Sequence, residues 1–153
     1  MSEFRFRAAA ALELRRKQET EAGTALALAE AELRASEQLA AEADATRRSA
    51  QQDLVSIERQ GSDVETLLWH RNWIIRLSND LTERHRRVSE LADVVRQAEE
   101  RWRQARQRRL ALERMHERAL RRFKQDQLRQ ELKVIDELAR LRYVMPDAWR
   151  DES

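Results

Sequence analysis

Apolar and small residues recur through the first part of the chain with the seven-residue period of a coiled coil. Two rows carry this repeat: Leu12, Glu19, Leu26, Leu33, Ala40, Arg47 and Leu54, with Ala22, Ala29, Ser36, Ala43, Ala50 and Ile57. The rows are interrupted at Glu19 and Arg47 and are rich in alanine, which favours helix and lets a partner helix approach closely. The pattern predicts a helix over about residues 5–60.

A turn signal follows this stretch. Gly61 can adopt the left-handed conformation that ends a helix, and Ser62 or Asp63 can cap the next one. Glu65 would then lie in the first turn of the following helix, where a negative charge is favourable. We therefore expect a turn at about residues 61–63.

The second periodic stretch is longer. Its rows are Ile74, Leu81, Val88, Val95, Trp102, Arg109, His116 and Phe123, with Leu77, Arg84, Leu91, Ala98, Ala105, Leu112 and Ala119. After Phe123 the register slips, and apolar residues resume at Leu128, Leu132, Ile135, Leu138 and Ala139. Pro146 disfavours helix at the residue before it. We predict a helix over about residues 64–144 and a flexible tail at 146–153.

These elements predict an all-α fold, a long antiparallel two-helix coiled-coil hairpin that forms one domain over residues 1–145. Folding back at Gly61 places residue 5 opposite roughly residue 117, so that about 25 helical residues would extend beyond the first helix. The alternatives are a parallel homodimer of one continuous helix and a purely structural dimeric coiled coil. The turn signal and the different seams of the two halves favour a monomeric hairpin.

Composition excludes several classes of protein. The chain has two glycines, one proline and no cysteine, which is too few turn residues for a sheet protein and leaves no glycine-rich phosphate loop. The histidines at 70, 85 and 116 are well separated, so we expect no metal site. Asp136 and Glu137 point in different directions on a helix and make a poor acid–base pair. We expect no catalytic residue, no cofactor, no small-molecule ligand and no membrane-spanning helix.

Charge is concentrated in one segment. Residues 101–122 hold nine arginines and two glutamates, whereas the rest of the chain is close to neutral. This segment could be a solvated face paired with acids of the first helix, a surface for an acidic protein partner, or a nucleic-acid site. No aromatic-interleaved basic pattern and no DNA-reading motif is present, so we expect no nucleic acid.

A second notable segment, residues 67–77, follows the turn directly. It holds two tryptophans and five aliphatic residues, more than a single buried stripe can accommodate. The segment is either a local hydrophobic cap at the hairpin tip or a docking patch for a partner protein.

Three segments resemble the FliJ family, the coiled-coil component of the flagellar type III export apparatus. They are Phe4-Arg5-Phe6-Arg7 with Leu12-Glu13-Leu14-Arg15 and Glu19; Trp102 with Ala105-Arg106, Leu112-Glu113-Arg114-Met115 and Glu117-Arg118; and Arg129-x-Glu131-x-Lys133-x-x-Asp136-Glu137-x-Ala139. The third segment is the most specific. Leu132 departs from the pattern, because the family more often has a polar Gln there.

The resemblance implies an antiparallel coiled coil similar to the central stalk of rotary ATPases. Such proteins sit in the hole of the hexameric export ATPase and promote its ring assembly and activity. They also contact the export gate membrane protein and handle empty export chaperones. The implied location is cytoplasmic, peripherally associated with the inner membrane at the flagellar base.

Carried onto this chain, the resemblance gives two groups of contact residues. The ATPase-ring candidates are Phe4, Phe6, Arg129, Glu131, Lys133, Asp136 and Glu137. The export-gate candidates are Trp69, Trp73 and Leu77. The alternative is the equivalent stalk protein of a virulence-type (injectisome) secretion system.

Overall fold

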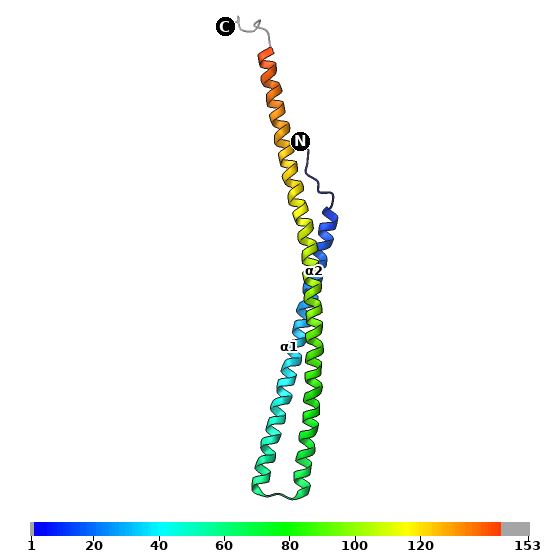
Figure 1. Ribbon diagram of the computed structural model, residues 1–153, viewed down its shortest axis with the longest axis vertical. Helices are drawn as coiled ribbons and strands as arrows, with labels where there is room; N and C mark the ends of the chain where they lie inside the picture. Colours follow the sequence, from blue (N-terminus) through cyan, green and yellow to red (C-terminus); the bar gives the residue numbers. More distant parts are fainter. Residues whose placement is uncertain (1, 145–153) are drawn as a thin grey trace. The chain divides into compact units, whose positions relative to one another are not determined.

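The computed structural model describes residues 2–144, which form two α-helices. Helix α1 spans Ala9–Gln60 and helix α2 spans Val64–Val144 (Figure 1). No strand occurs among these residues, and the predicted all-α antiparallel two-helix hairpin is confirmed. The tail predicted at 146–153 lies outside the described residues.

The connection between the helices is formed by Gly61, Ser62 and Asp63. Gly61 has a φ of 75°, the left-handed conformation expected of a residue that ends a helix. The Asp63 carboxylate accepts a hydrogen bond from the backbone N–H of Thr66 at 3.3 Å and so caps α2. Hydrogen bonds from Thr66 lower the pKa of Asp63, because they favour its charged form.

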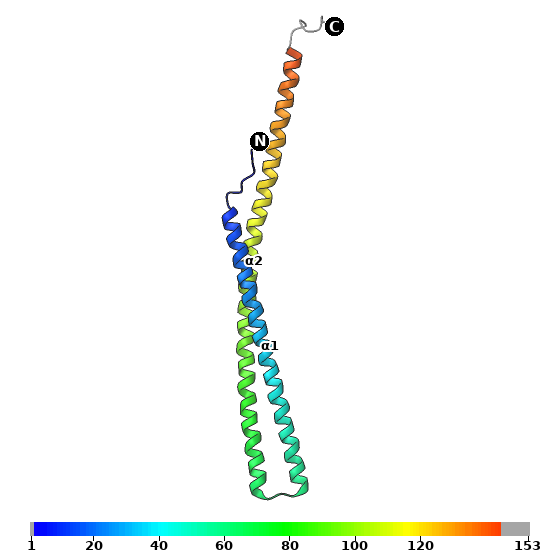
Figure 2. The ribbon, with the colours of Figure 1, turned by 180° about the vertical axis from the view of Figure 1, so that it is seen from behind.

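The chain divides into two compact units, of which Lys17–Arg106 is here called the hairpin unit. Its two helical segments lie side by side when seen from either side (Figures 1 and 2). Every position that the two heptad rows assign to this unit is buried or half-buried. The buried residues are alanines on α1 and larger aliphatics on α2: Ala29, Ala40, Ala50, Leu91 and Val95. The small-residue face of α1 therefore packs against bulkier side chains of α2.

The interruption of the seam at Arg47 is accommodated by an ion pair within α1. Arg47 Nη2 lies 3.0 Å from Asp44 Oδ1, and Arg48 Nη2 lies 2.9 Å from the other carboxylate oxygen. The hydrogen bond from Arg47 and the charge of Arg48 lower the pKa of Asp44. The half-buried cation is thus neutralised one turn away on its own helix.

The second unit, called the terminal unit, combines Met1–Arg16 with Gln107–Ser153. Its described residues before Ala9 form a non-helical strap, residues 2–8, that precedes α1. The heptad pattern predicts a start of the helix near residue 5, whereas α1 begins at Ala9. In the strap, half-buried Phe4 and Phe6 alternate with exposed Arg5 and Arg7, which is the period of an extended chain rather than of a helix.

Beyond the strap, α2 is uncovered. Gln127 is the last half-buried residue of α2, and all of residues 128–144 are exposed. The uncovered stretch is shorter than expected, because an extended strap advances about 3.3 Å per residue against 1.5 Å in a helix. No helix among the described residues is long and apolar enough to cross a membrane.

Candidate functional site

An aromatic cluster holds the strap against α2 in the terminal unit. The ring centroids of Phe4 and Phe6 lie 5.5 and 5.0 Å from that of His116, each with the rings edge to face. Phe4 also lies 5.4 Å from Phe123. At the start of the strap, Gln127 Nε2 donates a hydrogen bond of 3.4 Å to the Ser2 carbonyl. These contacts place residues 4 and 6 at residue 116, close to the register predicted by folding the chain back at Gly61.

Phe4 and Phe6, two of the predicted ring-contact residues, are therefore engaged within the chain itself. Both are half-buried, whereas Arg5 and Arg7 beside them are exposed. The face that the strap offers to a partner consists of these guanidinium groups and the accessible part of the two half-buried phenyl rings.

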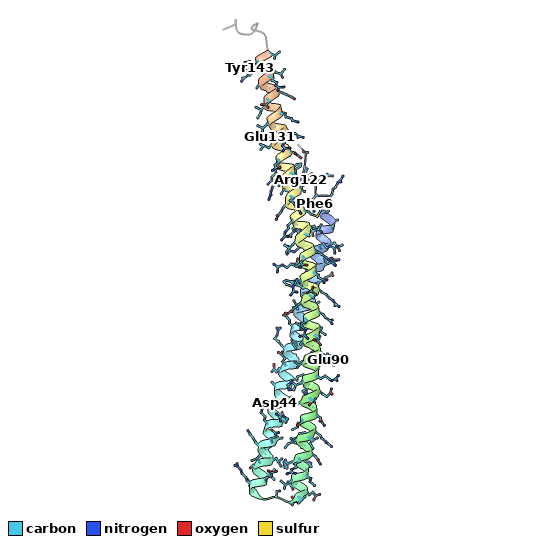
Figure 3. All side chains as sticks on the ribbon, viewed as in Figure 1. Phe6, Asp44, Glu90, Arg122, Glu131 and Tyr143 are labelled. Atoms are coloured by element: carbon cyan, nitrogen blue, oxygen red, sulfur yellow. The ribbon has the colours of Figure 1, made fainter. Side chains whose placement is uncertain are left out.

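The other five predicted ring-contact residues lie together on the uncovered part of α2. Arg129, Glu131, Lys133, Asp136 and Glu137 are all exposed, and Figure 3 shows Glu131 on this segment, below Tyr143. Arg129 lies 4.0 Å from Asp126. The other four make no ion pair with any residue in 2–144, so their charges are available to a partner.

The uncovered segment also has an apolar stripe. Leu128, Leu132 and Ile135 are each more than half exposed. At 100° per residue they share a sector of about 60°, and Arg129, Lys133 and Asp136 share another sector about 100° away. The heptad row that contains His116 and Phe123 would continue to Gln130 and Glu137. The apolar stripe therefore lies on a different face of α2 from the seam that packs against α1 and the strap. This is the predicted register slip, and it produces an amphipathic helix with no covering helix in the terminal unit.

At the hairpin tip, Trp69 and Trp73 are stacked. Their ring centroids are 6.3 Å apart with an interplanar angle of 17°, and the His70 ring lies edge-on 4.9 Å from Trp69. Together with Ala45, Ser49 and other residues of α1, they line a shallow hollow. Trp69 remains 62% exposed and Trp73 40% exposed. Much of the indole surface next to the turn therefore stays accessible.

Leu77, the third predicted gate residue, belongs to the helix seam and is half-buried. Leu68 and Ile75 are instead more than half exposed and lie on other sides of α2. The accessible apolar surface at the tip is therefore formed by the stacked tryptophans and these aliphatic side chains more than by Leu77.

The arginine-rich segment has few ionic partners. Arg103 pairs with Glu100 at 2.8 Å and Arg109 with Glu113 at 2.7 Å, both within α2. Arg106 lies over the Trp102 ring at 5.4 Å. Besides Arg106, six arginines make no ion pair with any described residue: Arg101, Arg108, Arg114, Arg118, Arg121 and Arg122. Each of these six side chains is exposed, and none of them pairs with an acid of α1 among the described residues.

The sequence reasoning named Arg118 and Arg122 only as members of the arginine-rich segment, and it did not single out His116 or Phe123 as site residues. The heptad rows did contain His116 and Phe123, and the folded-back register placed them near the strap. The alternation Phe4-Arg5-Phe6-Arg7 is the signal that could have revealed the strap and the cluster beneath it.

The described residues contain no group of three or more His, Cys, Asp or Glu side chains that could hold a metal ion. The exposed features have the chemistry of protein–protein contact: stacked indoles in the hairpin unit, and arginines, carboxylates and an apolar stripe in the terminal unit. The fold and these surfaces define the chain as a helical-hairpin protein whose accessible groups suit binding to other proteins.

The comparison with family profiles assigns the class. The profile of the family described as Flagellar FliJ protein matches residues 8–146. The chain belongs to the FliJ family, and is a protein associated with type III secretion.

Other comparisons are sparse. A solved structure reported as a candidate YscO homologue from Chlamydia trachomatis is 17% identical, with 92% of this chain and 96% of that chain covered and a TM-score of 0.48. No curated protein sequence matches the chain.

Proposed function

We propose that this protein is a non-enzymatic component of the flagellar export apparatus, acting as central stalk and activator of the hexameric export ATPase. The observation that supports the role most strongly is the family match over residues 8–146. The terminal unit enters the ring, and the hairpin tip reaches the export gate membrane protein. The protein also takes part in the handling of export chaperones, and works in the cytoplasm at the inner membrane beneath the flagellum.

The terminal unit has suitable chemistry for a ring contact. The exposed charges of Glu131, Lys133, Asp136 and Glu137 have no ionic partner among the described residues. Ion pairs at a solvated surface are each worth little, roughly 0–1 kcal/mol. A stalk held by such contacts could change partners within a ring without a large barrier, which suits an activator that must not lock the ring.

The tip has suitable chemistry for the gate contact. Trp69 and Trp73 form an exposed aromatic stack, and aromatic residues are enriched at the centres of protein interfaces. In this proposal the stacked tryptophans contact the gate, and Leu77 packs in the helix seam behind them.

The first test is a titration of the purified cognate export ATPase with this chain. Stimulation near one chain per hexamer is expected, because one stalk acts on a whole ring. Absence of both stimulation and co-elution would contradict the stalk role.

A charge-reversal pair tests the ring contact. Asp136→Lys with Glu137→Lys should weaken ATPase binding and stimulation while leaving helicity unchanged. The matched control is Glu21→Lys with Glu32→Lys, which makes the same charge change at exposed positions of the hairpin unit. Equal loss in both variants would show that net charge, and not this site, is responsible.

A further inference from the structure

A groove runs between the strap and one flank of α2 in the terminal unit. It has a volume of about 890 Å³, which lies in the range of sites that hold several side chains. The strap contributes residues 3–7, and α2 contributes Met115, Arg118, Ala119, Arg122, Phe123 and Asp126. Both residues of this groove that Figure 3 labels line it together, and Arg122 on α2 is drawn just above Phe6 of the strap.

The floor of the groove is apolar. Phe4, Phe6, Met115, Ala119 and Phe123 all line it. The rings of Phe4 and Phe6 are fixed by their contacts with His116, and Phe4 also contacts Phe123. Met115 is about half exposed and adds a flexible, polarisable side chain. A bulky apolar group could therefore be buried here without rearrangement of the cluster.

The rim of the groove is basic. Four arginines line it, two from the strap and two from α2: Arg5, Arg7, Arg118 and Arg122. None of them makes an ion pair with a described residue. Arg118 is partly oriented, since its Nε donates a hydrogen bond of 3.3 Å to the Arg114 carbonyl. Two acids also line the groove, Glu3 and Asp126, and Asp126 already lies 4.0 Å from Arg129. The lining has a net positive charge.

We infer that this groove binds an acidic segment of a protein partner, with carboxylates on the arginine rim and a bulky apolar side chain on the phenylalanine floor. Guanidinium groups take carboxylates in a bidentate geometry, and the unpaired rim leaves them free to do so. Nucleic acid would place phosphates on the rim, but the phenyl rings below are already engaged, Phe4 with His116 and Phe123 and Phe6 with His116. A flat anionic membrane would meet the rim without filling the floor.

This inference does not rest on the stalk role, because it concerns binding to the isolated chain. The probe is a fluorescein-labelled synthetic peptide of repeating Glu-Glu-Leu triplets, and binding is measured by fluorescence anisotropy. A peptide of Glu-Glu-Ser triplets has the same charge without the apolar side chains. The Leu peptide should bind at least about tenfold more tightly than the Ser peptide, because only the former fills the floor.

Variants of α2 locate the site. Arg118→Glu with Arg122→Glu should weaken binding of the Leu peptide at least about tenfold. The control is Arg114→Glu with Arg121→Glu, which makes the same change of charge on the same helix at two unpaired arginines that do not line the groove. This control should weaken binding of the Leu peptide less than about threefold. Circular dichroism should show equal helicity in both. The milder pair Arg118→Gln with Arg122→Gln provides the same test if the reversal lowers helicity.

Three results would overturn the inference: no binding of the Leu peptide, equal binding of the two peptides, or equal losses in the two reversal variants. Parallel titrations with duplex DNA and with phosphatidylglycerol vesicles complete the design. The reversal at Arg118 and Arg122 could weaken binding of the DNA or of the vesicles more than it weakens binding of the peptide. That result would assign the groove to the DNA or the membrane and contradict the proposal.

Discussion

Gly23 of α1 faces the indole ring of Trp102 on α2. A Cβ placed on Gly23 would lie 3.5 Å from both Cδ1 and Nε1 of the indole, which is ordinary van der Waals contact. The glycine lets the largest side chain of the α2 seam lie against the α1 backbone. One methyl group fits in this position, and any larger side chain would have to displace the ring.

We therefore predict that Gly23→Ala stabilises the hairpin unit and that Gly23→Leu destabilises it. Alanine should add about 0.5–1 kcal/mol, because glycine in a helix interior costs about that amount. Leucine should cost about 1–3 kcal/mol through overpacking against Trp102. Urea unfolding followed by circular dichroism measures both, and a lower midpoint for the alanine variant would contradict the geometry described here.

Two identical substitutions on α2 should have very different effects. Leu91 is 5% exposed in the hairpin unit, whereas Leu141 is 61% exposed on the uncovered segment. Leu91→Ala should cost about 2–4 kcal/mol and Leu141→Ala less than about 0.5 kcal/mol. Comparable losses in thermal unfolding would mean that Leu141 is covered in solution, for example by a second copy of the chain.

The Asp63 cap makes stability depend on pH. Its pKa is lowered from the ordinary 3.8 by hydrogen bonds from Thr66, so its contribution is present above the ordinary value and is lost as pH falls through the lowered one. Asp63→Ala should lower the melting temperature at neutral pH, and the difference from the unaltered chain should shrink as pH falls below the ordinary pKa of 3.8. Asp63→Asn, which keeps a capping oxygen, should lose less. If the difference in melting temperature between Asp63→Ala and the unaltered chain is the same at every pH, the charge of Asp63 contributes nothing to stability.

The aromatic cluster of the strap predicts a spectroscopic signature. The His116 ring lies within 5.5 Å of two phenyl rings, whose ring currents should displace its side-chain proton resonances from their usual positions. In a Phe4→Leu, Phe6→Leu variant these resonances should return toward ordinary values while α2 stays helical. Unchanged His116 signals in that variant would mean that the strap is detached in solution.

The heptad rows predicted the packing of the hairpin unit because each helix has one partner, so a single apolar stripe per helix records nearly all of its tertiary contacts. The same reasoning failed at residues 2–8. Phe4 and Phe6 lie four and two residues before Ala8, spacings that an extended chain and a helix can share in part. The seven residues of the strap are too few to distinguish a period of 2 from a period of 3.6 next to a strong helical repeat. The start of α1 at Ala9 therefore became evident only in the structure.

The candidate sites were predicted to different degrees for a related reason. Trp69 and Trp73 were identified because an apolar excess near a turn is visible in sequence. The groove beneath Arg118 and Arg122 combines residues more than a hundred positions apart, from the strap and from α2, and no spacing along the chain reveals it. The slip after Phe123 was visible, but only the exposure of Leu128, Leu132 and Ile135 shows that the stripe lacks a covering helix.

The ion pairs of the hairpin unit have a mechanical consequence. Most of the ion pairs described in this unit join residues of the same helix, as Arg86 does with Glu83 and Glu90, whereas Arg71 with Glu58 joins α2 to α1. The pairs within one helix would survive if one helix slid past the other by a heptad. These intrahelical charges therefore stiffen the individual helices and do not set their alignment. The Trp102 indole packed against Gly23 fixes the register of the two helices, because sliding would move the indole from glycine onto a residue with a side chain.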